Sequence, residues 1–272
     1  MTRRLFVAWQ DEQSRTWHTI ARLTKSDSSY ELVFTKGARQ LKDLTQVLFG
    51  MNMGYRYQFD TLIPLLKNKL PPKSRLDYPA MLRWLNLSQH ETEFDLIAKF
   101  GLIPGSDSLI IYPEPSVIGG FFELEFFVHG IRYMHRDVMS WCSGTKEEIE
   151  LFPMLDVCNP FDNDAVALRL RDGGLIIGYV PIFYSPVISN ILRDETSRRT
   201  CRIEIVRCND DAPNQLKILC KITADVPINF DPASAEEQQP VDAFIASSLD
   251  AAPSTPRSVF YRHSENFPFK TS

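Results

Sequence analysis

The chain has 272 residues, 44% of them hydrophobic, and a formal net charge of −4 at pH 7. This length and apolar content favour a folded protein with one large or two small domains. No apolar run approaches the roughly 20 residues of a membrane-spanning helix, and a polar stretch soon follows the apolar residues after Arg3 and Arg4, so we expect no transmembrane helix, no secretory signal and a cytoplasmic location.

The charge is divided unevenly along the chain. Residues 1–90 carry 14 Lys and Arg against 7 Asp and Glu, whereas the remainder carries 16 against 27. The densest basic stretch holds Lys67, Lys69, Lys73 and Arg75. A local positive surface can attract phosphate groups even on an acidic protein, because exposed charges are screened over about 8 Å at physiological salt. An ordinary solvated loop is the alternative.

The first third of the chain is predicted to form a small antiparallel meander. Its β-prone segments are separated by polar stretches, as strands of a meander are. These segments are residues 5–9, 16–23 and 30–35.

Two helices are predicted after the meander. Asp77 can cap the first, with Pro79 in its first turn. Ser88 and Glu91 have the spacing of a capping box for the second, and Gly101 is a suitable C-terminal stop. A strand at 109–112 follows, and prolines then break the pattern, so we place a domain boundary near residues 114–120. Residues 1–118 are thus predicted as a small α+β domain.

Beyond this boundary the pattern is that of a compact β-barrel. Six short strand signals recur with one short helix near residues 186–192, and Asp172-Gly173-Gly174 supplies a tight hairpin. The strand signals lie at 122–130, 148–152, 165–170, 175–180, 202–207 and 216–223. We predict a β-barrel domain over 119–230. Residues 231–272 are poor in large apolar side chains until Phe260, which predicts a disordered tail.

Cysteine usage argues against a metal site or a disulfide framework. The cysteines form no C-x-x-C pair, and no histidine lies at a ligand interval from them. We predict buried, reduced thiols and neither metal nor cofactor. The five cysteines are Cys142, Cys158, Cys201, Cys208 and Cys220.

Three ordered motifs in the barrel region carry a family resemblance. They are His129-Gly130-Ile131-Arg132-Tyr133, Asn159-Pro160-Phe161-Asp162-Asn163-Asp164-Ala165-Val166 and Ile177-Gly178-Tyr179-Val180-Pro181. Together they resemble the HIRAN domain, over about 100 of the 272 residues. The resemblance implies an OB-like barrel that grips the 3′-terminal nucleotide of single-stranded DNA.

The resemblance also implies roles for the motif residues. Arg132 and Tyr133 would line the pocket for the terminal nucleotide, Phe161 would stack on a base, and Asp162 would accept a hydrogen bond from the 3′-hydroxyl. Tyr179 would lie near the phosphate, and Asn159 belongs to the same DNA-binding set. Chemistry agrees with these roles, because a carboxylate accepts from a hydroxyl and repels a phosphate, and stacking on an aromatic ring is tolerant of sequence.

A purely structural reading of these residues stays open. The Asn159 to Asp162 segment is also a good turn, in which Phe161 could fill a core and Asp162 could cap backbone groups. Tyr133 and Tyr179 could be core aromatics. Arg132 could pair internally with Asp162.

Two departures from the family pattern weaken the case for DNA. Asp164 stands where Asn is common, and Ile182 stands where many members have a basic residue for the phosphate. Residues 126–194 hold six Lys and Arg against nine acidic residues, so this module alone is no phosphate-tracking surface.

The first third of the chain is similar to the N-terminal region of HipA-type serine/threonine kinases. The similarity rests on residues 5–23, 59–66, 77–79 and 94–101. The kinase core is absent, since no G-x-G-x-x-G with a downstream Lys appears. The resemblance implies a regulatory or partner-binding region without catalysis.

No nucleophile, base or metal motif stands out, so we expect no enzyme. The first hypothesis is a non-catalytic nucleic-acid-binding protein for single-stranded DNA 3′ ends, in DNA repair or defence. The alternative is a protein-interaction module, an antitoxin-like or adaptor subunit for a kinase-like or nuclease partner. DNA binding predicts that Arg132, Tyr133, Phe161 and Asp162 face solvent, whereas an adaptor predicts them buried with an apolar patch elsewhere.

Overall fold

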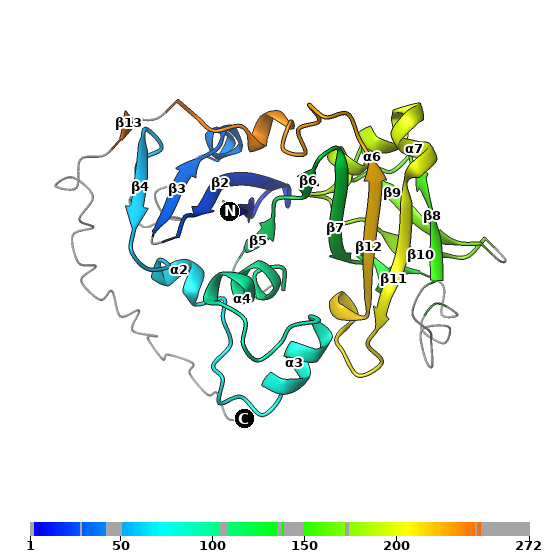
Figure 1. Cartoon of the computed structure of the whole chain (residues 1–272), viewed down its shortest axis with the longest axis horizontal. Coiled ribbons are helices and arrows are strands. Elements are labelled where there is room, and N and C mark those ends of the chain that lie inside the picture. Colours follow the sequence, from blue (N-terminus) through cyan, green and yellow to red (C-terminus); the bar gives the residue numbers. More distant parts are fainter. Residues whose placement is uncertain are drawn as a thin grey trace, which may run out of the picture.

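The structure is a computed structural model, and it describes residues 3–27, 29–41, 51–103, 108–134, 138, 149–171 and 174–242, with the backbone of 244 and 245. Two sheets lie side by side in it, with most helices around them (Figure 1). No helix in these ranges is long and apolar enough to span a membrane.

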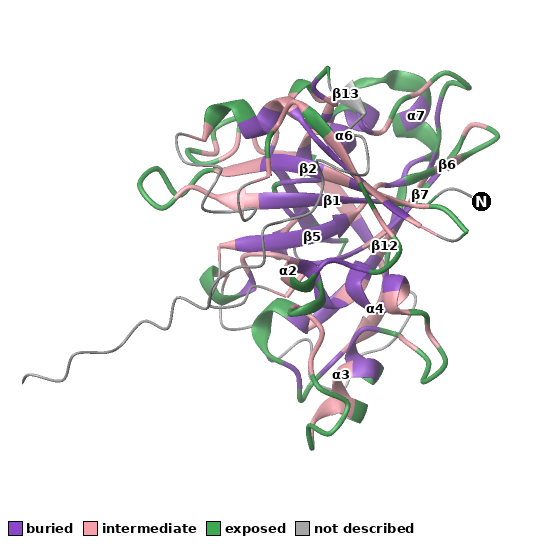
Figure 2. Cartoon of the chain, turned by 90° about the vertical axis from the view of Figure 1, so that its left-hand side faces the viewer, coloured by how far each residue is buried: buried purple, intermediate pink, exposed green. Residues whose placement is uncertain are grey.

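The first sheet has six strands in the order β13-β4-β3-β2-β1-β5, all antiparallel except the short β13–β4 pair. A buried stretch runs along the middle of β1, β2 and β5 (Figure 2). The strands are β1 (Arg3–Gln10), β2 (Trp17–Lys25), β3 (Tyr30–Phe34), β4 (Tyr55–Phe59), β5 (Leu109–Pro113) and β13 (Phe244–Ile245). The predicted meander is confirmed as β1 to β3.

Helices cover one face of this sheet. Val7 and Leu32 point into a core with Phe94 and Ile97 of the helix α4 (Glu93–Phe100). The covering helices are α2 (Pro64–Lys67) and α4, and a 3-10 helix η1 spans Lys36–Gln40. The helix α3 (Tyr78–Trp84) packs instead in a separate cluster with Phe127 and Leu219. Asp77 does precede α3, but its carboxylate binds Arg75 and not the helix N-terminus.

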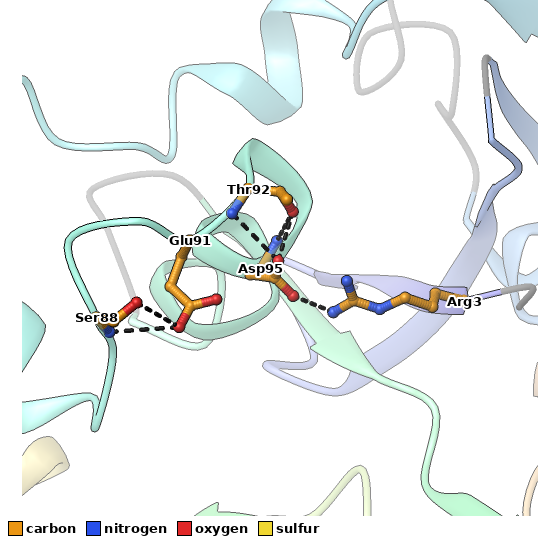
Figure 3. A network of polar contacts seen from close by, with 5 residues as sticks. All are labelled: Arg3, Ser88, Glu91, Thr92 and Asp95. Carbon is orange, nitrogen blue, oxygen red and sulfur yellow. Dashed lines mark hydrogen bonds and ion pairs between the residues drawn. The ribbon is translucent and has the colours of Figure 1, made fainter.

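The predicted capping box at Ser88 and Glu91 is wrong by one turn. The hydroxyl of Thr92 accepts from the Asp95 N–H, and the Asp95 carboxylate accepts from the Thr92 N–H, so Thr92 caps α4 (Figure 3). The Ser88 amide and hydroxyl instead donate to Glu91 in the preceding turn. Arg3 of β1 also binds Asp95, which fixes the helix to the sheet.

The second sheet has seven antiparallel strands in the order β10-β9-β8-β11-β12-β7-β6. The predicted barrel is not closed, because in the described ranges only an isolated bridge between His129 and Tyr179 joins β10 to the chain after β7. The strands are β6 (Ser116–Ile118), β7 (Phe121–Phe127), β8 (Ile149–Leu155), β9 (Val166–Leu170), β10 (Ile176–Tyr179), β11 (Arg202–Cys208) and β12 (Ile218–Asp225).

Two short helices connect β10 to β11. The helix predicted near residues 186–192 is present as α6 (Ser185–Arg193), and α7 (Glu195–Thr200) follows it directly. Two 3-10 helices, η2 (Ile131–Tyr133) and η3 (Asn214–Leu216), complete the sheet's surroundings.

A shared core joins the two sheets. Phe6 and Tyr112 of the first sheet belong to the same buried cluster as Phe122 and Ile188 from the region of the second. The Tyr112 ring stacks on Phe183 at a centroid distance of 4.6 Å. The fold is therefore α+β with two antiparallel sheets packed on common apolar side chains, and its division at residue 118 stays a prediction.

The segment after β12 returns to the first sheet and is not a tail at its start. Val241 is buried and donates its N–H to the carbonyl of Phe34 at 3.0 Å. Gln238, in the 3-10 helix η4 (Glu236–Gln238), is also buried and donates to the Tyr112 hydroxyl at 3.2 Å. We call residues 231–242 the C-terminal strap; it crosses from the second sheet towards β13 in Figure 1.

The predicted start of the disordered tail at Asp231 is thus wrong. The strap has few large apolar residues, and it is held instead by backbone hydrogen bonds and by small buried side chains such as Ala233. The remaining predicted tail, residues 246–272, lies outside the described residues.

Candidate nucleic-acid interface

Tyr179 connects the three motifs predicted from the sequence. Its backbone exchanges two hydrogen bonds with His129, of 2.8 and 2.9 Å, at the start of the first motif. Its hydroxyl donates to Asp156 at 3.0 Å, at the base of the loop that holds the second motif. The end of β10 therefore fixes the η2 turn and the β8–β9 loop relative to one another.

Gly178 is what allows this close approach. Its φ is +150°, and a Cβ atom there would lie 2.4 Å from Cγ1 of Val128 and 2.5 Å from the His129 carbonyl oxygen. Only glycine leaves room for the two strands to meet here. The glycine of the third motif is thus explained by packing.

The β8–β9 loop is stiffened by two Asx turns. The Asn159 side-chain oxygen accepts from the Phe161 N–H at 3.0 Å, and the Asp162 carboxylate accepts from the Asp164 N–H at 2.9 Å. The Asn159 amide also donates to Asp156 at 3.2 Å. Because Asn and Asp bond their own backbone two residues on, they favour this turn.

These turns place Phe161 in solvent. Its exposure is 88%, so its alternative role as a core residue is wrong. Val157, in the same loop, is 77% exposed and was not predicted as part of the site. A large apolar ring held in water by a hydrogen-bonded loop is suited to contact a ligand.

Arg132 and Tyr133 form a second exposed element on η2. Tyr133 is 72% exposed, which rules out its alternative role in the core. The Arg132 guanidinium lies 4.5 Å from the Tyr133 ring centroid and donates to its hydroxyl. Among the described residues Arg132 forms no ion pair with Asp162, so the predicted internal pair is wrong. A planar cation beside an exposed ring offers both stacking and charge.

The remaining two predicted site residues serve the fold. Both polar atoms of the Asn159 side chain are used in the loop, and the Tyr179 hydroxyl is used by Asp156. Burial, then the hydrogen bond to Asp156 and its charge, raise the pKa of Tyr179. Asp156 itself was not predicted, since nothing in the sequence marks it as the partner of a tyrosine 23 residues away.

The two departures from the family pattern have different outcomes. Asp164 accepts from Ser189 at 2.9 Å and from Arg193 at 2.7 Å, which anchors the loop to α6. Its charge is therefore compensated by Arg193 at a partly exposed position. Ile182 is 36% exposed and offers no charge.

Much of the basic character of residues 1–90 is used to hold the chain together. Among the described residues, five ion pairs join a basic residue of this region to an acidic residue of the remainder. They are Arg3–Asp95, Arg4–Glu114, Lys36–Glu236, Lys67–Glu93 and Arg83–Asp211. In the predicted basic stretch, Lys67 and Arg75 are paired with carboxylates and Lys69 donates to a backbone carbonyl. The charge asymmetry therefore contributes to internal docking.

The predicted burial of the cysteines holds for some of them. Cys201 and Cys220 are buried as predicted, and burial raises the pKa of Cys201 to about 11. The prediction is wrong for Cys158, which is exposed, and Cys142 lies outside the described residues. No group of three potential metal ligands occurs in the part of the chain that the structure describes.

Comparison with known proteins gives two distant structural matches. One is the crystal structure of the HIRAN domain of human HLTF, with 14% identity and a TM-score of 0.32, covering 45% of this chain and 92% of that one. The other is the crystal structure of a protein from Lactobacillus plantarum, with 10% identity and a TM-score of 0.31, covering 39% of this chain and 97% of that one.

Sequence comparison adds nothing to these matches. No protein-family model matches the chain, and no curated protein does. Neither structural match is named as a HipA-type kinase, and the predicted similarity of the N-terminal region receives no support. The chain has a HIRAN domain as a structural neighbour, at a likeness too low to carry a function.

Proposed function

We propose that the protein binds single-stranded nucleic acid without catalysis, through the exposed face formed by Arg132, Tyr133 and Phe161. The observation that carries this is the exposure of two aromatic rings, 72% for Tyr133 and 88% for Phe161, on turns linked through Tyr179. Burying such rings against water-exposed bases is favourable, and each stacked base contributes about 1–3 kcal/mol.

The site also holds groups of both charges that a strand end needs. Arg132 supplies a planar cation for a phosphate. Asp162 keeps a carboxylate in the same loop as Phe161, where it would accept a hydrogen bond from a free 3′-hydroxyl and repel a 3′-phosphate. We therefore propose the 3′ end of a single DNA strand as the ligand, which would suit a role in DNA repair or defence.

An adaptor function has less support from the site. It predicted that Arg132, Tyr133, Phe161 and Asp162 would be buried. The first three are exposed and Asp162 is half-buried. Phe161 and Val157 could still contact an apolar protein surface, so the test must separate a base from a protein side chain.

The test is fluorescence anisotropy with a 5′-labelled single-stranded oligonucleotide and the full chain. Phe161→Ala should weaken binding by about 1–3 kcal/mol if one base stacks on the ring. Phe161→Leu keeps apolar bulk and removes the ring face, and it should lose most of the same affinity. Phe121→Ala removes another exposed phenylalanine, 45% exposed at the start of β7, and should have no effect.

Three results would count against the proposed function. The wild type could fail to bind, Phe161→Leu could bind as tightly as wild type, or Phe121→Ala could lose as much as Phe161→Ala. The second of these would indicate an apolar contact and favour the protein-interaction alternative. Thermal melting of each variant checks that the fold is intact.

A further inference from the structure

Arg22, in the middle of β2, has a buried Nε atom with no hydrogen-bond partner. Among the described residues, it is the one buried side-chain donor that has no hydrogen-bond partner. A buried polar group without a partner is uncommon in folded proteins and calls for a bound water, ion or ligand. Arg22 is half-buried, so its guanidinium lies at the border between the sheet and solvent.

The strand register places Arg22 in a row across the first sheet. Arg22 is opposite Phe6 on β1 and Val33 on β3, and Val33 is opposite Arg56 on β4. Directly opposite residues share a face of the sheet. Arg22 and Arg56 therefore lie on one face, two strands apart, with Val33 between them.

A second row on the same face adds one more arginine and two carboxylates. Arg4 lies two residues from Phe6, and Glu31 lies two residues from Val33, so both share the face of Arg22. Arg4 pairs with Glu114 at 3.2 Å, and Arg56 is 3.8 Å from Glu31. Arg22 has no such partner among the described residues, so the face has three guanidinium groups for two carboxylates.

The charges around Arg22 confirm that it is under-compensated. Burial lowers the pKa of Arg22, and so do the neighbouring cations Arg4 and Arg56, against the opposing effect of Glu114 and Glu31. Arginine nevertheless keeps its proton in proteins. The positive charge therefore remains, and an anion close to it would be stabilised.

We propose that Arg22, with Arg4 and Arg56 on either side, forms an oxyanion site for a phosphate group. Guanidinium forks match the oxygen geometry of phosphate, and several of them together favour phosphate over a single hydroxyl or amide. The site is open to a ligand, because the Arg4 and Arg56 side chains are 43% and 40% exposed.

The phosphate could come from two sources. One is a backbone phosphate of the nucleic-acid strand whose end binds at Phe161; this source rests on the proposed function. The other is free inorganic phosphate or a small phosphorylated molecule. The chemistry at Arg22 is the same for both, and the experiments below separate them.

The first experiment is thermal melting of the full chain in inorganic phosphate and in chloride at equal ionic strength. A ligand that binds the folded state raises the melting temperature by mass action. We expect phosphate to raise it for the wild type, and Arg22→Met, which keeps a stem and removes the fork, to lose the phosphate-specific rise. Arg22→Lys should retain part of the rise, because it keeps the charge without the fork. The control Arg39→Met removes an exposed arginine elsewhere and should keep all of it.

Two outcomes of melting overturn the site. One is a wild type that melts alike in phosphate and chloride. The other is an Arg22→Met variant with an unchanged phosphate rise. Each variant is compared with itself in the two salts, so a change in its baseline stability does not affect the reading.

The second experiment measures the salt dependence of oligonucleotide binding for the wild type and Arg22→Met. If the strand backbone supplies the phosphate, the log–log slope should fall by about 0.7 for the lost phosphate contact. Equal slopes, with the phosphate-specific melting rise present, assign the site to free phosphate. A wild type that binds no strand but keeps that rise refutes the proposed function and leaves the Arg22 site standing.

Discussion

The hydroxyl of Tyr179 lies 3.0 Å from the carboxylate of Asp156 and donates a hydrogen bond to it. This contact joins the end of β10 to the base of the loop that exposes Phe161. The same tyrosine is tied to His129 through its backbone, and η2 with Arg132 follows two residues later. One residue, through its backbone and its side chain, thus sets the spacing of the two exposed aromatic elements.

Removing this hydroxyl should loosen the site more than the fold. Tyr179→Phe loses one hydrogen bond to a charged group, which costs about 1.5–3 kcal/mol when the bond is protected and less at a half-buried position. We expect a stability loss of about 1 kcal/mol by urea unfolding and weaker strand binding by anisotropy. Tyr55→Phe, at an exposed tyrosine of β4, is the control and should change neither.

Asp162→Asn should erode the preference for a 3′-hydroxyl over a 3′-phosphate. The amide oxygen can still accept from the Asp164 N–H, so the Asx turn and the fold should survive. What is lost is the negative charge that repels a terminal phosphate. Anisotropy with two oligonucleotides that differ only at the 3′ end measures the preference. A wild type without any preference would refute the role of Asp162.

Gly178→Ala should destabilise the protein far more than Gly119→Ala. Both glycines have positive φ, of 150° and 59°, but a Cβ at 178 would meet backbone and Val128 whereas one at 119 has nothing within 4 Å. We expect losses of about 2–4 kcal/mol at 178, from overpacking and backbone strain, and about 1 kcal/mol at 119 from strain alone. Chemical denaturation compares the two, and equal losses would show that the close approach is unimportant.

The imidazole of His129 should make the protein less stable in acid. Burial lowers the pKa of His129 to about 4, below its usual 6.5. Between pH 6.5 and pH 4 the unfolded chain therefore binds a proton at His129 that the folded chain does not bind. The contribution of neutral His129 to the unfolding free energy is complete above pH 6.5 and is lost as the pH falls towards 4. The loss amounts to up to about 3 kcal/mol.

The corresponding variant is His129→Phe, which keeps an aromatic ring beside Phe183 and cannot titrate. The difference in unfolding free energy between wild type and variant should change between pH 7 and pH 4.5. A difference that is constant over this range would contradict the neutral state of the His129 side chain.

The fragment 119–230 should not fold on its own. Tyr184 and Phe183 pack on Tyr112, and the core that they share includes Phe6. Removing residues 1–118 would expose this surface to water, at a cost of about 25 cal/mol per Å² of apolar area. Near-ultraviolet circular dichroism and thermal melting test this. A fragment that melts cooperatively near the temperature of the full chain would instead support two independent domains.

The alternating segments of the fold were predictable from the sequence. The segment 202–207 was predicted as a strand from alternating isoleucines and charged residues, and it is β11 (Arg202–Cys208). β8 extends three residues beyond its predicted end, and Pro153 lies in this extension. Only residues before Pro153 pair with β11, so its missing N–H breaks no hydrogen bond between β8 and β11. The short strands β4 and β13 were not predicted, since the half-exposed residues of β4 lack a clear apolar pattern and β13 has only two residues.

For the site, the sequence identified the motif residues but left open whether they are exposed, and it missed the residues that support them. Phe161, Tyr133 and Arg132 were identified from local motifs, and local turns do place them in solvent. Asp156 was missed because its contact with Tyr179 depends on how two strands come together in space. Arg22 was missed for the same reason, since its neighbours come from β1, β3 and β4.

The C-terminal strap has a consequence for how the chain folds during synthesis. Thr35 bridges Pro240, and β13 pairs with β4, so the first sheet is completed by residues that are made roughly 200 positions later. At about 5–20 residues per second, the ribosome needs roughly 10–40 s to deliver them. Until then β4 is a bare strand edge, open to pairing with another chain. The polar and charged side chains of β4, such as Arg56 and Gln58, suit a strand edge that stays exposed to solvent until β13 is synthesised.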